Sequence, residues 1–408
     1  MTRSARVVER VAALTAADWN ALDHEGSPFT RHEFLSALET TGCIGENTGW
    51  RPWIVTLHDE RGLAAAAPAW LKDDSYGEFV FDFAWAQAYA RHGLKYYPKL
   101  VVAAPFTPAT GPRLLVRGDL AADPAERLTW RRALQQELLA AAEREALSSV
   151  HVLFPSEPEL ESLGAEWLPR IDCQFHWQNR GYENFDDFLA TFTADKRKKA
   201  KRERRRVAES GIRFESRLGS EASLNEILIA WQLHRTTFLR RGNEPYLGPE
   251  TFVQIAKTMG DALLFKFAMQ NDEIVAVAVF FIGRDTLYGR YWGSAEDYHS
   301  LHFETCYHQG IEFCIERGLA RFEPGTQGEH KVSRGLCRRE HTRLTSSQSR
   351  AFVRRSPIIS IVSAKPSTVT PRASPSTFPT SSRWRCRDAP TSTRTRMART
   401  RRRSAGLS

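Results

Sequence analysis

The sequence predicts a mixed α/β protein made of two domains of similar plan, followed by a disordered tail. The chain has 408 residues, more than one ordinary hydrophobic core organises, and 42% of them are apolar. Helical and strand patterns alternate through residues 1–336, and the composition changes sharply after them. We therefore place domains at residues 1–172 and 173–336, and a basic, low-complexity, disordered tail at residues 337–408.

The first domain begins with a helix over Arg31–Thr40, where Phe34, Leu35 and Leu38 have helical spacing. RPWIVTLHDERGLAAAAPAWL predicts two strands around a turn at Asp59–Gly62. GEFVFDFAWAQAYARHG predicts a strand that runs into a helix, Ala121–Ala146 a long amphipathic helix, SSVHVLFPS a short buried strand, and WLPRIDCQFHWQNRGY a pair of strands.

The second domain follows the same logic. FDDFLATFTADKRKKAKRERRRVAESGI predicts one helix that ends at Gly211, IRFESRL a strand, and LNEILIAWQLHRTTFLRR a helix. LLFKFAMQNDEIVAVAVFFIGRDTLYGRYWG predicts three strands, LHFETCYHQGIEFCIERG a helix, and ARFEPGTQG a last strand. Because helices alternate with strands in both halves, we expect two domains with mixed sheets.

The charge of the chain is unevenly distributed. The formal net charge is +9, but residues 337–408 contain 17 Lys and Arg against 2 Asp and Glu, so residues 1–336 are acidic overall. The basic balance of the whole chain therefore does not indicate a nucleic-acid-binding main body. No apolar run reaches the length of a membrane span, the start lacks a cleavable signal, and the six cysteines show neither CxxC nor metal-ligand spacing, which predicts a cytoplasmic protein without a metal site.

Several long strings resemble the FemAB-like branch of N-acyltransferases in the GNAT superfamily. They are TGWRPWIVTL, GEFVFDFAWAQAYARHGLKYYPKLVVAAPFTPATGPRLL, QFHWQNRGYENFDDFLATFTADKRKKAKRER and LYGRYWGSAEDYHSLHFETCYHQGIEFCIERGLARFEPGTQGEHKVSRG. The resemblance covers about residues 1–336. It implies two tandem GNAT-like domains with a cleft between them. It also implies transfer of an acyl or aminoacyl group to an amine, on a small molecule, a peptide or a cell-wall precursor of peptidoglycan.

The same resemblance makes the end of the chain anomalous. Such proteins continue after KVSRG with a segment like LPxxTHSAHW and a helix like YLxxExxAVDxYAxEL, and neither is present. If the codons for LCRREHTRLTS are read one nucleotide earlier, synonymous choices permit LPARTHSAHF. In that same frame IISIVSAKPSTVTPRA permits YLDREREAVDRYA. We therefore predict a frameshift near Leu336, in the gene or in its sequencing, and the nucleotide sequence around that codon tests it.

Acyl transfer to an amine needs a base, a group that stabilises the carbonyl oxygen, and a site that holds the donor. The donor expected first is an acyl-CoA, bound transiently and not as a permanent cofactor. Arg290 and Gly293 lie in RYWGSA, which fits a GNAT phosphate-loop pattern, although no helix starts directly after it. A strand end with packed aromatic side chains is the alternative.

Two further segments carry candidate catalytic side chains. Glu304 and His308 lie four residues apart and hence on one face of the predicted helix, either as a tuned imidazole or as an ordinary surface pair. The loop Gly325–Lys331 offers Glu329 or His330 as a base and Lys331 as a ligand for phosphate or carboxylate, unless it is a simple surface turn.

In the first domain, aromatic residues surround one acid and one base. Asp82, Trp85, Tyr96, Tyr97 and Lys99 are candidates to line an acceptor cleft, although such a run more often packs in a core.

Nine of the eleven residues from Lys196 to Arg206 are Lys or Arg. Charge must wrap around a helix of this composition, so it favours a polyanionic partner such as a tRNA donor, or else a solvated surface balanced by acidic neighbours. The predicted function is N-acyl transfer from an acyl-CoA or an aminoacyl-tRNA. The alternatives are a nucleic-acid-binding protein that uses this helix and the Arg-rich tail, and an inactive truncated remnant of the enzyme.

Overall fold

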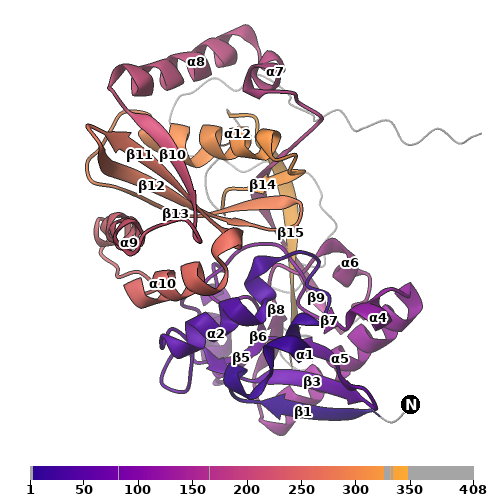
Figure 1. Ribbon diagram of the computed structural model, residues 1–408. Coiled ribbons are helices and arrows are strands. Elements are labelled where there is room, and N and C mark those ends of the chain that lie inside the picture. Colours follow the sequence, from indigo (N-terminus) through magenta and orange to yellow (C-terminus); the bar gives the residue numbers. More distant parts are fainter. Residues whose placement is uncertain (1–2, 81, 165, 326–330, 332–333, 348–408) are drawn as a thin grey trace, which may run out of the picture. The chain divides into compact units, whose positions relative to one another are not determined.

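A computed structural model describes residues 3–80, 82–164, 166–325, 331 and 334–347. All of them belong to one compact unit, Met1–Lys365. Helices and strands alternate along the chain, so the predicted mixed α/β class is confirmed (Figure 1).

The helices of the first half are α1 (Ala16–Asn20), α2 (His32–Thr40), α3 (Phe83–Arg91), α4 (Gly118–Ala121), α5 (Pro124–Arg144) and α6 (Glu157–Leu160), with 3-10 turns η1 (Val11–Ala13) and η2 (Pro28–Thr30). Its strands are β1 (Ser4–Val8), β2 (Arg51–Pro52), β3 (Ile54–Asp59), β4 (Gly62–Ala67), β5 (Ala69–Lys72), β6 (Lys99–Val102), β7 (Leu115–Val116) and β8 (Ser149–Val152).

The long strand β9 (Leu168–Gln178) leads to the second half, whose helices are α7 (Phe185–Ala190), α8 (Ala194–Glu209), α9 (Leu224–Leu239), α10 (Pro249–Thr258), α11 (Leu301–Phe303) and α12 (Gln309–Glu316), with a 3-10 turn η3 (Gly260–Ala262) and a π-helical turn η4 (Glu304–His308). Its strands are β10 (Arg213–Leu218), β11 (Leu263–Gln270), β12 (Glu273–Ile282), β13 (Thr286–Ser294), β14 (Arg321–Glu323) and β15 (Cys337–Ser347).

Most predicted elements form, and the exceptions have local causes. The single helix predicted after Phe185 is two helices, because Thr191–Thr193 interrupts it and Thr193 is the N-cap of α8. The strand pair predicted before Tyr182 is the one long strand β9. Between β5 and α3 the described residues form no strand, and the backbone there turns through Gly77 and Phe79 at positive φ.

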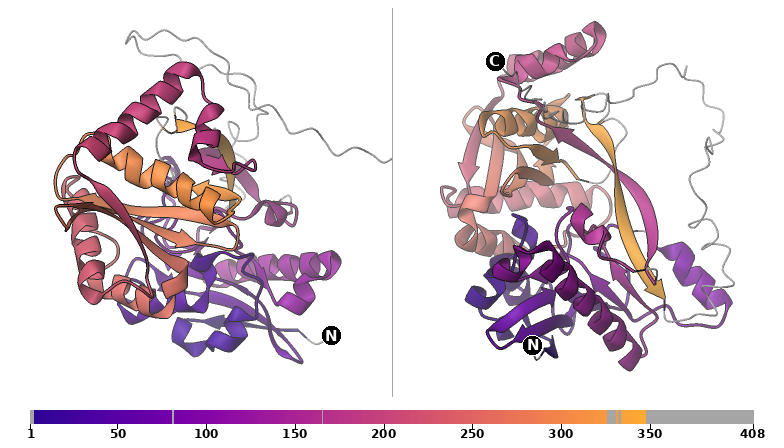
Figure 2. Two further views of the ribbon diagram at one scale, coloured as in Figure 1. Left: turned by 45° about the horizontal axis from the view of Figure 1, so that its top comes forward. Right: turned by 90° about the vertical axis from the view of Figure 1, so that its right-hand side faces the viewer.

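Two sheets form the framework. Strands β1, β3, β4 and β7 make a small antiparallel sheet, and eleven strands make a larger one in the order β10-β11-β12-β13-β14-β9-β15-β8-β6-β5-β2. The large sheet contains two parallel pairs, β6 with β8 and β13 with β14. Between those pairs, β9 and β15 run antiparallel side by side, as the long magenta and orange arrows in Figure 2 show. The two halves are thus joined in one continuous sheet.

Alternating side chains explain why the strands of the second half are nearly continuous in apolar residues. Phe265, Val277 and Phe281 face the cluster that contains Leu233 of α9, whereas Ala278 and Phe280 face the cluster that contains α12. Both faces of the sheet are therefore covered by helices, and period-two alternation places apolar groups on each.

Packing continues from one half to the other. Phe29 lies 5.0 Å from Phe281 and 5.2 Å from Tyr288 between ring centroids, and the Thr41 and Thr251 hydroxyls lie 2.9 Å apart. The loops that follow the parallel strands consequently meet at a densely packed junction.

The segment Cys337–Ser347 differs from the prediction that the chain loses regular structure after Leu336. It forms β15, which pairs with β9 from Cys337 to Thr345 and with β8 from Leu344 to Ser347. Leu344 and Thr345 are buried in this arrangement. The segment therefore forms a strand because β9 and β8 supply pairing partners, although its own composition is polar. The rest of the predicted tail, residues 348–408, lies outside the described residues, and the frameshift remains a prediction.

Candidate functional site

The candidate site lies where the carboxyl ends of the parallel strands meet. The strands β13 and β14 pair only from Thr286 to Tyr288, after which β13 continues to Ser294 paired with β12. The loop after β6 reaches this point, because the Thr110 amide donates a hydrogen bond to Glu323 at the end of β14, at 3.3 Å. Ligands of open α/β sheets bind at such carboxyl ends.

Glu323 is a buried carboxylate with few partners. One oxygen accepts the Thr110 amide, and the other lies 3.8 Å from His176 Nδ1. Burial raises the pKa of Glu323 from 4.5 to about 7, and the opposing effects of the Thr110 amide and of Arg321 are smaller. A carboxylate tuned to this range can take and return a proton near neutral pH.

His176 lies beside Glu323 because β9 pairs with β14, and its neighbours define its protonation. Gln174 donates from Nε2 to the Pro108 carbonyl at 2.9 Å, so its Oε1 is left to accept from His176 Nε2 at 2.9 Å. Burial lowers the pKa of His176 to about 3. The ring is therefore neutral at pH 7 and presents the Nδ1 lone pair to Glu323.

A small cavity of about 10 Å³ opens at this carboxylate, close to the least space that holds one water molecule. It is lined by Pro108, Ala109, Gln174, Tyr288, Gly289, Arg290, Glu323 and Gly325. The lining therefore comes from the loop after β6, from β9, from β13 and from the end of β14.

Three phenylalanines with strained backbone conformations lie in or near the loop that follows β6. Phe79, Phe106 and Phe154 have φ of 57°, 55° and 53°, in the left-handed region that bulky side chains seldom adopt. Phe106 lies in the loop, Phe79 packs near Arg290, and the Phe154 carbonyl accepts from the Gly111 amide at 3.1 Å. Such strain is typical of ligand-binding regions, where surrounding packing holds it in place.

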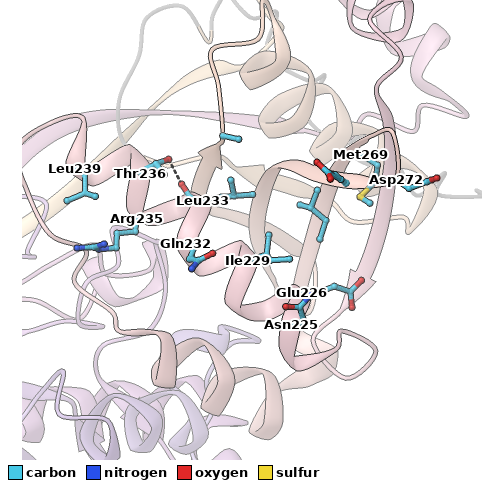
Figure 3. A pocket seen from close by; sticks show the side chains of 13 residues that line it. Asn225, Glu226, Ile229, Gln232, Leu233, Arg235, Thr236, Leu239, Met269 and Asp272 are labelled. Atoms are coloured by element: carbon cyan, nitrogen blue, oxygen red, sulfur yellow. Dashed lines mark hydrogen bonds between the residues drawn. The ribbon is translucent and has the colours of Figure 1, made fainter.

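Two larger cavities differ in their volume and in the residues that line them. One of about 380 Å³ is lined by residues of both halves, among them Trp50, Lys72, Asp74, Phe106 and Tyr246, and it lies on the other side of the same loop. The other, about 870 Å³, is an open groove beside α9 that Figure 3 shows. Most of its charged side chains are already paired, Glu226 with Arg217, Asp272 with Arg213 and Arg235 with Glu244, so it offers no concentration of reactive groups.

The structure places the sequence-predicted catalytic residues in separate environments. Glu329 and His330 lie outside the described residues. Glu304 and His308 are both buried in the π-helical turn η4 and are joined by a hydrogen bond of 2.9 Å from Nδ1 to Oε2. Glu304 also pairs with Arg204 at 3.1 Å, so this pair belongs to an internal network under α8.

The predicted donor-binding residues also have identified contacts. The segment proposed as a phosphate loop is a strand, because residues 291–294 pair with β12. Gly293 approaches α9 so closely that a Cβ there would lie 1.9 Å from the Leu233 carbonyl oxygen, and packing alone therefore requires glycine. Lys331 is buried and donates to the Gly325 carbonyl at 2.7 Å, and burial lowers its pKa to about 8.

The acceptor-cleft candidates of the first half meet, but in the interior. Tyr96 donates to Asp82 at 2.5 Å, Lys99 pairs with Asp82 and with Glu78, and Tyr97 contacts Ser75 at 2.8 Å. Lys99 has no exposed surface, and Trp85 is 1% exposed. The prediction that these side chains line a cleft is therefore corrected to a buried polar network beneath α3.

Sequence reasoning missed Glu323, His176 and Gln174. Their only local signal was an acid at the end of a buried strand, directly before Pro324 and Gly325, and two polar residues at alternate positions of β9. Within the described ranges, no group of three His, Cys, Asp or Glu side chains is placed to hold a metal ion, and no helix is long and apolar enough to span a membrane.

Comparisons with known proteins identify the family. The model of the FemAB-like family, described as peptidoglycan biosynthesis/recognition, matches residues 10–354. The chain therefore belongs to the FemAB-like family. The match includes all of β15 and extends beyond Leu336. None of the curated proteins matches the sequence significantly.

Several solved structures are similar to this chain. FemX is 9% identical with a TM-score of 0.51, over 87% of this chain and 99% of its own. L-PGS from Bacillus licheniformis is 14% identical, with a TM-score of 0.47 over 80% of this chain and 93% of its own. A tandem GNAT protein from the clavulanic acid biosynthesis pathway is 8% identical, with a TM-score of 0.40 over 85% of this chain and 98% of its own. The likeness to FemX shows that the two chains share a fold.

Proposed function

We propose that this protein is an N-acyltransferase whose general base is Glu323 and whose acceptor is an amine on a peptidoglycan precursor. The observation that carries the proposal is the buried carboxylate with a pKa of about 7 that faces a cavity at the carboxyl end of β14, beside the middle of β13. Membership of a family described as peptidoglycan biosynthesis/recognition supports a transferase and this class of acceptor.

The chemistry follows from the position of Glu323. An amine attacks a carbonyl only when its nitrogen lone pair is free, so the attacking nitrogen must lose a proton during the reaction. Glu323 accepts that proton, and His176, whose Nδ1 lies 3.8 Å away, stays neutral. The donor is an acyl-CoA or an aminoacyl-tRNA. The cavity beside Trp50, Lys72 and Tyr246 is large enough for part of either substrate.

A direct assay tests this function. The full-length protein is incubated with acyl-CoA donors and with aminoacyl-tRNA, each against a panel of amines that includes a peptidoglycan stem peptide, and amide products are detected by mass spectrometry. We expect a product with at least one donor, and strong loss of that product with Glu323→Gln. Absence of product with every donor and acceptor would contradict the proposal.

One feature favours the tRNA donor over acyl-CoA. On α8, Ala200 and Val207 face inward, while most of the Lys and Arg side chains are exposed. Several are paired, as Lys201 is with Asp186 and Arg204 is with Glu312, but Lys198 and Arg202 form no ion pair with any described residue. Exposed unpaired cations on one helix suit a phosphate backbone.

Reversing those two charges should weaken tRNA binding and its dependence on salt. For Lys198→Glu combined with Arg202→Glu, we expect the slope of log K against log salt to fall by about 2, since each lost phosphate contact removes about one. The matched control is Arg132→Glu with Arg144→Glu, an equal charge change at exposed positions of α5. Filter-binding titrations at several salt concentrations measure the slopes, and equal effects of both variants would refute a contact at α8.

A further inference from the structure

Arg290 lines the cavity of Glu323, is half-buried, and has no carboxylate partner among the described residues. Its Nη2 donates to the Phe106 carbonyl, its side chain also interacts with the Tyr291 hydroxyl, and its guanidinium lies 5.6 Å from the ring centroid of Phe79 and 5.5 Å from that of Tyr291. Its Nε is buried and makes no hydrogen bond. No carboxylate of the described residues lies within ion-pair distance of it. Buried charges are ordinarily paired, so this arrangement is costly unless another group completes it.

Arg113 shows that burial alone does not explain the missing partners. It is 1% exposed and also has no ion pair among the described residues, but it donates from Nε to Leu153, from Nη1 to Pro112 and from Nη2 to Ala109, at 2.8, 2.9 and 2.7 Å. Backbone carbonyls thus satisfy this guanidinium within the same loop. Arg290 lacks such a set, although it lies against that loop from the opposite side.

The geometry of the cavity restricts which group can bind to the Arg290 guanidinium. The cavity is small, about 10 Å³, so only a group about the size of one oxygen atom fits beside the guanidinium without movement of the loop. The other wall is Glu323, a carboxyl group that is about half ionised at neutral pH. A site with a base on one wall and an unpaired cation on the other is suited to a reaction that creates negative charge at one atom while it removes a proton from another.

We infer that Arg290 is a catalytic residue that binds the carbonyl oxygen of the transferred acyl group and stabilises the oxyanion formed there. This inference rests on the proposed acyl transfer and names a second participant in it. The amine nitrogen attacks the carbonyl carbon, the carbonyl π electrons move to the oxygen beside Arg290, and the amine proton goes to Glu323. When the tetrahedral intermediate collapses, the C=O bond re-forms and the bond to the donor sulfur or ester oxygen breaks. The proton from Glu323 goes to that leaving group, so the products are an amide and a free thiol or hydroxyl.

Two substitutions of Arg290 and one control test the role in turnover. Arg290→Gln should lower kcat by about 100- to 1,000-fold with KM within about threefold, because the lost interaction acts mainly in the transition state. Arg290→Lys should recover part of kcat, since it restores the charge without the planar fork. Arg113→Lys should lower the temperature of unfolding and leave kcat of the folded protein within about threefold. Unchanged kcat in Arg290→Gln would overturn the inference.

A binding measurement separates this inference from the proposed function. Crystals of the wild-type protein and of Arg290→Gln are soaked in sodium bromide, and the anomalous signal of bromide locates the anion. We expect a bromide within hydrogen-bonding distance of the guanidinium in the wild type and none at that place in the variant. If no donor supports turnover but bromide binds, the proposed function fails and the anion site stands. If turnover occurs and no bromide binds at Arg290, the inference alone fails. It also fails alone if bromide binds there as an adventitious ion only, that is, if Arg290→Gln leaves kcat unchanged.

Discussion

Replacing Glu323 by glutamine should lower kcat of acyl transfer by about 100- to 10,000-fold, the usual contribution of a general base. In the wild type, kcat/KM should rise with pH through an apparent pKa near 7, because Glu323 accepts a proton only when it is ionised. Glu323→Gln should lose this rising limb. Initial rates between pH 5 and 9 measure both effects, and an unchanged pH profile in the variant would assign the base elsewhere.

Glu323→Gln should not lower the free energy of unfolding, so its loss of kcat would not result from unfolding of the protein. The folded-state pKa of Glu323 lies above its unfolded value of 4.5, so between about pH 4.5 and 7 the folded protein keeps a proton that the unfolded chain has released. The free energy of unfolding therefore falls as pH rises through this window. Glu323→Gln cannot titrate, and we expect it to be at least as stable as the wild type at pH 8.

Glu159 provides the matched control. It is also fully buried with a raised pKa, but it accepts backbone amides from Arg113 at 2.7 Å and Leu114 at 2.5 Å, and it lies in α6 and does not line the cavity of Glu323. Glu159→Gln should lower the free energy of unfolding by about 1–3 kcal/mol. The Ser156 N–H donates a hydrogen bond to the Glu159 carboxylate, and the NH2 group of glutamine cannot accept it. It should leave the pH dependence of turnover as in the wild type.

Local spacing predicted the parts of the structure that depend on neighbouring residues. The i, i+4 spacing of Glu304 and His308 predicted their contact, which the hydrogen bond of 2.9 Å confirms. The period of the apolar residues predicted α5 and the three strands β11, β12 and β13, which form close to the expected limits. Short-range periodicity is enough for these because each element buries one or two regular faces.

The site itself depends on contacts that the sequence does not encode locally. Glu323 meets His176 because β14 pairs with β9 in one register, and it meets Thr110 because the loop after β6 crosses between the halves. Glu323 is more than a hundred positions from both of these residues, so no motif contains them. The strand β15 was missed for a similar reason, since its arginines and threonines resemble a polar tail until β9 and β8 supply partners.

The buried network around Lys99 leads to the second large effect. Lys99 is fully buried, and it pairs with Asp82 and with Glu78, which lies 2.9 Å away. Although burial opposes the charge, the two carboxylates hold the pKa of Lys99 above its ordinary value. Burial raises the pKa of Glu78 to about 7, whereas for Asp82 the charge of Lys99 and hydrogen bonds outweigh burial and lower the pKa. The cluster therefore holds one cation against one full and one partial negative charge.

Lys99→Met should lower the free energy of unfolding by about 3–5 kcal/mol at pH 8, because it leaves two carboxylates buried without their cation. Without Lys99, the folded-state pKa of Glu78 rises further above its unfolded value, and burial is no longer outweighed at Asp82, whose pKa rises from below its unfolded value. The folded protein then keeps protons that the unfolded chain releases, so stability falls as pH rises, and the loss should be smaller at pH 5 than at pH 8. Guanidinium denaturation of both proteins at the two pH values measures this difference, and an equal loss at both would mean that packing alone is affected.

Lys72 supplies the control for that experiment, because it pairs with Lys99 in the β-ladder and is equally buried. Its carboxylate partner, Asp74, is 57% exposed, and its ammonium also rests on the face of Trp50 at 4.2 Å. Lys72→Met consequently leaves an ion-pair carboxylate that water can solvate and removes only the weaker of the two lysine effects on Glu78, so it should cost less than Lys99→Met and show a smaller difference between pH 5 and pH 8. Partial recovery of stability when Asp82→Asn is added to Lys99→Met, but not when it is added to Lys72→Met, would locate the effect in the charge of the buried cluster.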